Sequence, residues 1–195
     1  MATTASCTIR PARASDFDAV ADITNHYILT TPIHFSTEPI PADEQRRNWE
    51  ATRGRYPYLI AESPDGSGGV GGVLGYAKAG VWRNRAAYDW TPEVGLYIHK
   101  DHHRRGLGRA LYLRLFEIMA AQNYHAAFAG ATLPNDASIR LHAELGFESV
   151  GIVRQAGWKM GRWWDVEYFR KPLAPADRPA RPIEPVEAAL ARLAG

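Results

Sequence analysis

A chain of 195 residues is long enough to bury a substantial core in one domain, and its 46% hydrophobic and 23% charged residues are ordinary for a globular protein. This composition excludes a disordered chain, and a formal net charge of only +2 argues against a dedicated nucleic-acid binder. The only cysteine, Cys7, leaves no internal disulfide, so a reducing compartment is expected.

The start of the chain and its hydropathy bear on location. Residues 1–8 lack the basic and then apolar pattern of a signal peptide, and no apolar run approaches the length of a membrane span. The expectation is a cytoplasmic protein with neither a membrane nor a nucleic acid as its partner.

The first part of the chain predicts a strand and a helix. Thr8–Ala12 has the pattern of a strand, and Ser15 followed by Asp18 resembles a capping box at a helix start. The helix itself is indicated by apolar residues that recur at helical spacing: Phe17, Val20, Ala21, Ile23, Tyr27 and Ile28.

A loop, a second helix and a hairpin should follow. Thr31–Pro41 is rich in Pro and Thr and predicts an ordered loop, after which a second helix runs to Gly54. Two strands, Tyr58–Ala61 and Val73–Val81, are separated by Pro64–Gly72, whose five glycines and one proline suit a hairpin turn.

Tyr88–Ile98 is the expected central strand of the sheet. Its side chains alternate between two faces, with Glu93, Gly95 and Tyr97 on one and Val94, Leu96 and Ile98 on the other.

The second half of the chain predicts further strands and helices and then an extended tail. After a basic loop over His99–Gly108 comes a long helix with the apolar stripe Leu111, Leu115, Ile118 and Met119. The elements after it are a strand over Ala126–Thr132, a helix over Asp136–Leu145, and strands over Phe147–Val153 and Trp163–Arg170. This order predicts a single α/β domain over residues 8–172, with one mixed sheet covered by helices on both faces. Five prolines beyond Lys171 predict an extended tail over residues 173–195.

The basic loop has the features of an anion site. His103 to Arg109 lie between an apolar strand and a helix, whose N-terminus presents unpaired N–H groups and a partial positive charge. Gly106 and Gly108 lack Cβ atoms, so a pyrophosphate can approach the backbone closely, and the neighbouring arginines add charge. The alternative is a solvated basic turn. The pattern is neither the dinucleotide fingerprint nor a P-loop.

A strand, then Arg/Gln-x-x-Gly-x-Gly/Ala, then a helix resembles the acetyl-CoA pyrophosphate loop of the GNAT superfamily, with His103 in place of the usual Arg or Gln. Leu133 to Ser138 resembles the second CoA segment of that superfamily, in which an Asn side chain holds the pantetheine arm. One branch, the phosphinothricin and methionine sulfoximine/sulfone N-acetyltransferases, is similar at several separate segments: 25–28, 35–39, 87–91, 133–136, 156–159 and 164–166.

This resemblance covers about residues 8–172 and implies the GNAT acyl-CoA N-acyltransferase fold, acetyl-CoA as co-substrate, no metal, and a homodimer. Trp158, Trp163 and Trp164 are candidates for the dimer contact. The implied acetyl-CoA contacts are Leu96, Tyr97, Ile98, His103, Arg104, Arg105, Gly106, Leu107, Gly108, Arg109, Asn135 and Ser138.

The chemistry requires a base, because an α-amino group with a pKa of about 7.7–8.0 is mostly protonated at neutral pH and cannot attack. The resemblance puts the catalytic glutamate at Glu93, where neighbouring Trp90, Tyr97 and the CoA arm would desolvate it and raise its pKa. A strand-edge glutamate in a surface ion pair is the alternative.

His142 is the second catalytic candidate. It lies seven residues after Asn135, about two helical turns, and so on roughly the same face. Many GNAT enzymes have a tyrosine here that protonates the departing thiolate, whereas this branch resembles the present chain in having histidine. His142 is expected to act as an acid for the thiolate or as a second base; a half-exposed helix histidine is the alternative.

Recognition of the acceptor is expected from Arg83, Arg85 and Tyr88, because the branch that this chain resembles carries two basic residues and a Tyr at this spacing. Arginine also offers a bidentate fork for carboxylate or sulfonyl groups. A basic loop at a sheet edge is the alternative for either arginine. Phe35, in the loop after the first helix, is expected to close over the substrate, and His26 and His34 are candidates for its entrance.

The predicted acceptor is therefore a small amino-acid-like amine such as L-phosphinothricin or methionine sulfoximine. Within the same fold, a protein N-terminus, a polyamine or an antibiotic amine stays open, although the two arginines would repel a polycation. A non-catalytic acyl-CoA- or RNA-binding module that uses 102–109 also stays open; the small net charge and the presence of Glu93 and His142 disfavour it.

Overall fold

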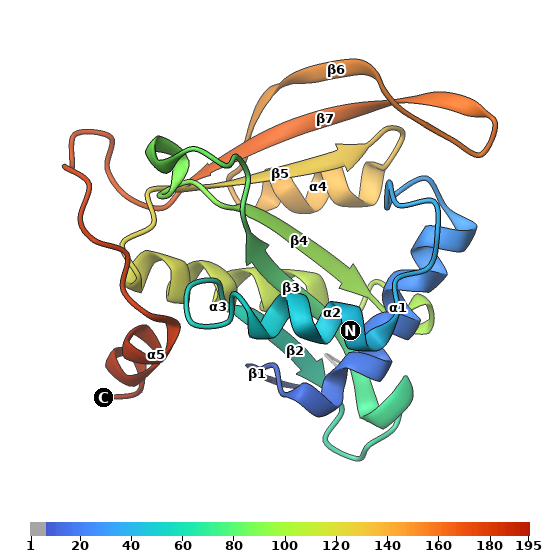
Figure 1. Ribbon diagram of the computed structural model, residues 1–195, viewed down its shortest axis with the longest axis horizontal. Helices are drawn as coiled ribbons and strands as arrows, with labels where there is room; N and C mark the ends of the chain where they lie inside the picture. The colour runs from blue at the N-terminus through green and yellow to red at the C-terminus, as the bar shows by residue number, and fades with distance from the viewer. Residues whose placement is uncertain (1–6) are drawn as a thin grey trace.

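The computed structural model describes residues 7–195, which form one mixed sheet with helices packed on both faces (Figure 1). The strand order is β1-β2-β3-β4-β5-β7-β6, and β4 and β5 are the parallel pair among antiparallel neighbours. The strands are β1 (Thr8–Pro11), β2 (Tyr58–Glu62), β3 (Val73–Gly80), β4 (Glu93–Ile98), β5 (Ala126–Thr132), β6 (Glu148–Lys159) and β7 (Arg162–Pro172). The helices are α1 (Phe17–Thr30), α2 (Ala42–Glu50), α3 (Leu107–Ala121), α4 (Asp136–Glu144) and α5 (Val186–Ala194). The predicted α/β fold with one mixed sheet is confirmed.

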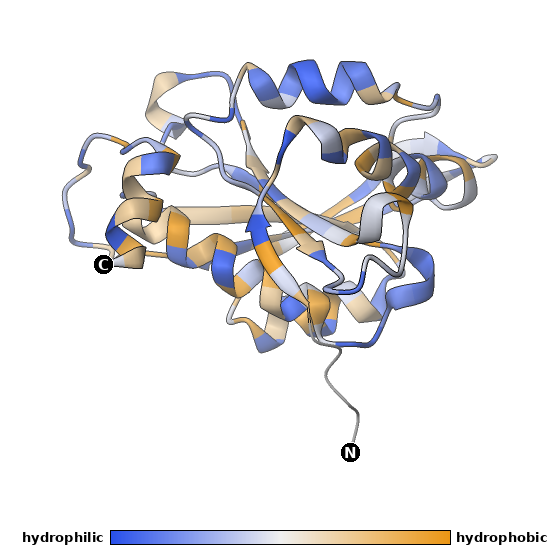
Figure 2. Cartoon of the chain, turned by 90° about the horizontal axis from the view of Figure 1, so that it is seen from below, coloured by the Kyte–Doolittle hydropathy of each residue, from blue (hydrophilic) through white to orange (hydrophobic). Residues whose placement is uncertain are grey.

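Two apolar clusters lie on opposite faces of the sheet, as the alternation along β4 requires. Val94 belongs to the cluster that contains the α3 stripe, whereas Tyr97 packs against the cluster of α1. The predicted stripe of α3 is fully buried: Leu111, Leu115, Ile118 and Met119. Figure 2 shows hydrophobic residues along the central strands and the helices beside them. Burial of these faces fixes which side chains of β4 point toward α3 and which toward α1.

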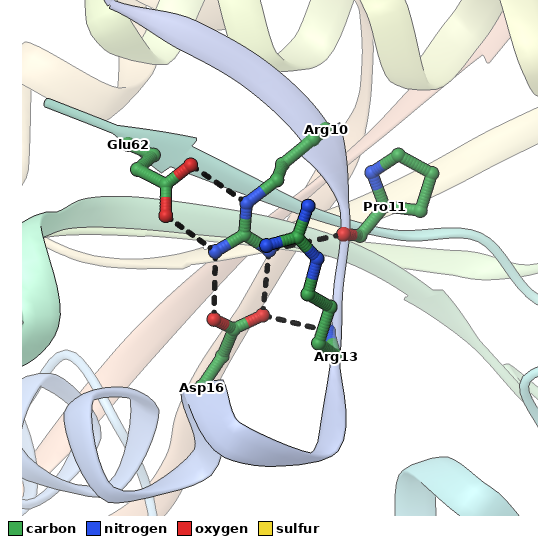
Figure 3. A network of polar contacts seen from close by, with 5 residues as sticks. All are labelled: Arg10, Pro11, Arg13, Asp16 and Glu62. Carbon is green, nitrogen blue, oxygen red and sulfur yellow. Dashed lines mark hydrogen bonds and ion pairs between the residues drawn. The ribbon is translucent and has the colours of Figure 1, made fainter. Parts of the chain in front are cut away.

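The start of α1 differs from the prediction. The Ser15 side chain does not cap this helix. The chain instead makes a short 3-10 turn over Ala14–Asp16, in which the Asp16 carboxylate accepts from the Arg13 backbone N–H at 2.7 Å. Asp16 also accepts two hydrogen bonds from the Arg10 guanidinium, which donates two more to Glu62 on β2, each at 2.8–2.9 Å (Figure 3). Arg10 lowers the pKa of Glu62. Asp16 therefore closes the turn that leads into α1 and joins that turn to β1 and β2.

The predicted bounds of two strands need correction. The central strand begins at Glu93 and not at Tyr88, because Ala86–Tyr88 forms a 3-10 turn and Pro92 precedes the strand. Proline has no N–H to donate, so it suits the position before a paired strand better than one within it. Strand β6 extends six residues beyond the predicted end at Val153, to Lys159, and forms a long hairpin with β7.

The tail is extended only at first. Residues 186–194 form α5, so the prediction of an extended segment to the end is wrong for this part. Val186 and Ala189 are buried in the cluster around α3. On the way to α5, the Trp90 indole N–H donates to the Arg181 carbonyl at 2.6 Å, and Gln122 exchanges hydrogen bonds with Glu184. Packing on α3 therefore buries the apolar side of α5.

Among residues 7–195, no helix has the length and apolar character needed to cross a membrane.

Candidate active site

The two parallel strands at the centre of the sheet separate from one another. Glu93 on β4 is in register with Phe128 on β5, and this is the single register pair between the two strands, both of which are fully described. Figure 1 shows them diverging toward their carboxyl ends. A cleft of about 1360 Å³ opens there, lined by β4, β5, the N-terminus of α3 and one face of α4. The divergence exposes backbone groups and side chains in the middle of the sheet.

The N-terminus of α3 faces this cleft. The first helical hydrogen bond runs from the Ala110 N–H to the Gly106 carbonyl, so the N–H groups of Leu107, Gly108 and Arg109 have no partner within the helix. Gly106 has φ of 79°, and a Cβ there would meet nothing within 4 Å, so the space before the helix is open. A left-handed backbone with free N–H groups in front of it is an anion cradle.

Gly108 is required for a different reason. A Cβ at this position would lie 3.0 Å from Leu96 Cδ2 on β4 and 3.3 Å from Leu141 Cδ2 on α4. The glycine therefore lets the first turn of α3 pack closely between these two elements, which sets the width of the cleft.

All but one of the predicted acetyl-CoA contacts line the cleft. The exception is Arg105, which points away and donates to the Asp101 carbonyl at 3.3 Å. The lining residues are Leu96, Tyr97, Ile98, His103, Arg104, Gly106, Leu107, Gly108, Arg109, Asn135 and Ser138.

His103 is tied to α1. The Tyr27 hydroxyl donates to the Ile98 carbonyl at 2.5 Å, and His103 Nε2 lies 2.6 Å from the Tyr27 oxygen, where it donates because the phenolic hydrogen is already used. Burial raises the pKa of Tyr27 to about 12, so the phenol stays neutral. Sequence analysis placed Tyr27 only in the apolar face of a helix and missed this link between α1 and the basic loop.

Glu93 lies at the point where the two strands begin to separate. Burial raises the pKa of its carboxyl group, and the positive charges of Lys78 and Arg83 oppose that rise. Lys78 lies across the ladder on β3, in register with Gly95, and lines the cleft. Its side chain is exposed to the cleft. Desolvation by the surrounding protein lowers the pKa of its ammonium group, and the charge of Glu93 opposes this change. Lys78 was not predicted, although it is the one charged residue in an otherwise apolar strand.

His142 is buried, with 3% of its surface exposed, and not half-exposed as the alternative supposed. Its ring stacks on Phe169 with centroids 4.9 Å apart, and Nδ1 lies 3.2 Å from the Ser138 hydroxyl. Nε2 is buried without a hydrogen-bond partner. Burial lowers the pKa of this imidazole, so its neutral form prevails at neutral pH. The result is a neutral ring in the wall of the cleft with one nitrogen free.

Asn135 is partly committed to the helix that it begins. Its side-chain oxygen accepts from the Ser138 backbone N–H at 3.1 Å, which caps α4. Its amide nitrogen stays available to the cleft.

The predicted acceptor residues divide into two groups. Phe35 and His34 line the cleft, and burial, followed by the charges of Lys78 and Lys159, lowers the pKa of His34 to about 4. Arg83, Arg85 and Tyr88 are exposed and do not line it. Their loop is held by Trp82, which stacks on Phe128 with ring centroids 3.9 Å apart and contacts Arg83 and Tyr88. Arg83 still acts on Glu93 through its charge.

No group of three or more potential metal ligands occurs among residues 7–195.

Comparison with known proteins agrees with this geometry. A model of the acetyltransferase (GNAT) family matches residues 20–147. A phosphinothricin N-acetyltransferase of Streptomyces viridochromogenes is 45% identical over 179 residues, 91% of this chain and 93% of that protein. An L-methionine sulfoximine/L-methionine sulfone acetyltransferase of Salmonella typhimurium is 35% identical over 84% of this chain and 92% of its own. The crystal structure of a GNAT-superfamily phosphinothricin acetyltransferase from Sinorhizobium meliloti in complex with acetyl-CoA superposes with a TM-score of 0.83, at 29% identity over 91% of this chain and 95% of that one. By its sequence and its split central sheet alike, this chain belongs to the acetyltransferase (GNAT) family.

Proposed function

We propose that the protein transfers the acetyl group of acetyl-CoA to the α-amine of a small amino-acid-like acceptor, such as L-phosphinothricin or methionine sulfoximine or sulfone. The observation that carries this proposal is a single cleft that joins an anion cradle at the start of α3 to the half-buried Glu93 and the buried His142. The names of the similar enzymes support the choice of acceptor. Acetylation of such toxic analogues would confer resistance to them.

The cradle suits the pyrophosphate of acetyl-CoA. Three backbone N–H groups in the first turn of α3 are free, the space before Gly106 is open, and Arg104 and Arg109 add positive charge at the cleft. Acetyl-CoA would supply the activated acyl carbon, and the amide nitrogen of Asn135 is placed to bind its pantetheine arm.

Glu93 is proposed to remove the proton from the acceptor ammonium, directly or through one water. The amine nitrogen then forms a bond to the acyl carbon, and the carbon–sulfur bond breaks. A carboxylate whose pKa is raised by burial is a better match to an amine than an exposed one, and the positive charges of Lys78 and Arg83 favour its ionised form.

His142 is proposed to stabilise the departing thiolate. When the Ser138 hydroxyl donates to Nδ1, the hydrogen of the neutral ring is on Nε2, the nitrogen that has no partner in the protein, and it can donate a hydrogen bond to the leaving sulfur. The proton that the sulfur takes up comes from the nitrogen of the tetrahedral intermediate, so the ring stays neutral.

A homodimer is proposed through the β6–β7 hairpin. Five apolar side chains of this hairpin are between 46% and 58% exposed, and a group of exposed apolar side chains marks an interaction surface, which single scattered ones do not. They are Val150, Ile152, Val153, Trp158 and Trp163. Trp164, by contrast, is partly buried and donates its indole N–H to the Lys159 carbonyl. A cytoplasmic location stays a prediction.

The test is a CoA-release assay with purified protein and acetyl-CoA. L-Phosphinothricin, methionine sulfoximine, methionine sulfone and the common amino acids are offered as acceptors, with spermidine and a peptide N-terminus as alternatives. Thiol release that depends on one of the first group, together with the mass of an N-acetyl product, is the expected result. Release only with spermidine or the peptide would refute the proposed acceptor class.

A further inference from the structure

Lys159 is a buried cation near the end of β6. It is 6% exposed, and its ammonium group donates to the carbonyls of Ile28 and His34 at 2.6 Å each. Both acceptors are neutral backbone groups, and an ammonium buried without an anion costs free energy that these two bonds must offset. A shorter apolar residue could fill this position at lower cost, so the hydrogen bonds themselves need an explanation.

The two carbonyls lie on either side of the bend that follows α1. Ile28 is in the last turn of α1, where its carbonyl would normally accept from residue 32, but Pro32 has no N–H to donate. His34 lies six residues further on, and its ring lines the cleft. Lys159 therefore joins the end of α1 to the loop that carries His34 and Phe35.

Gly157 holds the same loop from the same face of β6. A Cβ on Gly157 would lie only 2.5 Å from Phe35 Cε2 and 2.8 Å from Cδ2, so the ring of Phe35 rests directly on the glycine backbone. Trp158, between the two, points to the opposite side and is 57% exposed. Neither Gly157 nor Lys159 lines the cleft, whereas Ile33, His34 and Phe35 do.

We propose that Lys159 and Gly157 are positioning residues that hold residues 33–35 against the acceptor side of the cleft and so set the affinity for the acceptor. The inference rests on the proposed function, because it takes the Phe35 side of the cleft to be the acceptor side. Lys159 fixes the backbone of the loop, and Gly157 fixes the plane of the Phe35 ring.

The first experiment replaces Lys159 by methionine, which keeps an unbranched stem and removes the donors; Lys171→Met, on β7 and outside the cleft, is the matched control. With the buried Ile28 carbonyl and the part-buried His34 carbonyl left without donors, Lys159→Met should raise the acceptor KM by about 10-fold and leave the acetyl-CoA KM within about twofold. Hydrogen exchange of the amides in residues 31–41 should also accelerate, a readout that needs no acceptor. Equal rises in both KM values, or unchanged exchange in this loop, would overturn the proposal.

A second set of variants decides the question if Lys159→Met does not fold. Gly157→Ala should raise the acceptor KM by about 10-fold in the wild-type background but by less than about twofold in a Phe35→Ala background, where the ring that it displaces is gone. Gly54→Ala is the control, because a Cβ there meets nothing within 4 Å. Additive effects of Gly157→Ala and Phe35→Ala would refute the contact. Accelerated loop exchange in an enzyme that releases no CoA with any amino-acid acceptor would refute the proposed function and leave the positioning role intact.

Discussion

Replacing Glu93 by glutamine tests the base on which the proposed mechanism depends. The substitution keeps the shape of the side chain at the start of β4 and removes its ability to accept a proton. General-base catalysis contributes about 10²–10⁴-fold, or roughly 3–5 kcal/mol, so kcat should fall by that factor while the affinity for acetyl-CoA changes little. Glu93 is half-buried and burial raises the pKa of its carboxyl group, which is the environment expected of a base whose loss falls in this range.

The pH profile makes the prediction specific. A base acts in its deprotonated form, and burial raises the pKa of Glu93, so the acid limb of kcat/KM should lie above the range of an exposed glutamate. Lys78 lowers that pKa, hence Lys78→Met should move the acid limb to higher pH. Glu93→Gln should abolish this limb, and higher pH should partly restore its rate because more of the acceptor amine is then already deprotonated. Initial rates of CoA release between pH 5 and about 9.5 measure both effects, with Glu50→Gln on the exposed side of α2 as control. A Glu93→Gln enzyme with the wild-type kcat and acid limb would refute the assignment.

Three further predictions concern the cradle, the rim of the cleft and the fold. Gly108→Val should weaken acetyl-CoA binding by roughly 5- to 150-fold, because its side chain must displace Leu96 or Leu141 at a cost of about 1–3 kcal/mol. Wild-type affinity by calorimetry would contradict this. Arg83→Ala and Arg85→Ala should each raise the acceptor KM by about 3- to 10-fold and leave the acetyl-CoA KM unchanged. The effect should be smaller than that of a buried contact, because both side chains are exposed. Equal changes in both KM values would indicate a structural role. Arg10→Met should lower the free energy of unfolding by about 3–5 kcal/mol in urea titrations, because the carboxylates of Asp16 and Glu62 are left without their shared cation. A urea midpoint equal to that of the wild type would show that this network is not important for stability.

Local pattern was enough to predict those features that depend on neighbours in the sequence. The α3 stripe, the alternation along β4 and the glycine loop before α3 each have a period or spacing of their own, and all three are found as predicted. The cleft itself depends on the separation of β4 and β5 in the sheet, which no local pattern indicates; the resemblance to the GNAT superfamily implied the fold but not this opening.

Features built from distant residues could not be predicted in this way. Lys159 donates to carbonyls 131 and 125 residues away, and Tyr27 meets His103 across 76 residues. The sequence on either side of Lys159 or Tyr27 does not indicate whether the side chain lies in the core or connects two distant segments. Arg83 and Arg85 illustrate the reverse: their charge predicted a binding role, but the strand ends at Gly80, so no regular alternation turns them toward the cleft.

The path of residues 173–185 has a consequence for how this segment tolerates changes in length. It begins where the Leu173 N–H donates to the His125 carbonyl and ends where the Val186 N–H donates to the Gly54 carbonyl. Between these points, Arg181 and Glu184 are held through their backbones, whereas Pro175–Ala180 makes no hydrogen bond to the rest of the described chain. Insertions or deletions over 175–180 change only a loop and should be nearly neutral. A single-residue deletion from 181 onward shifts each later contact by one position and pulls Val186 and Ala189 out of the core, so length variation should be confined to the first half of the segment.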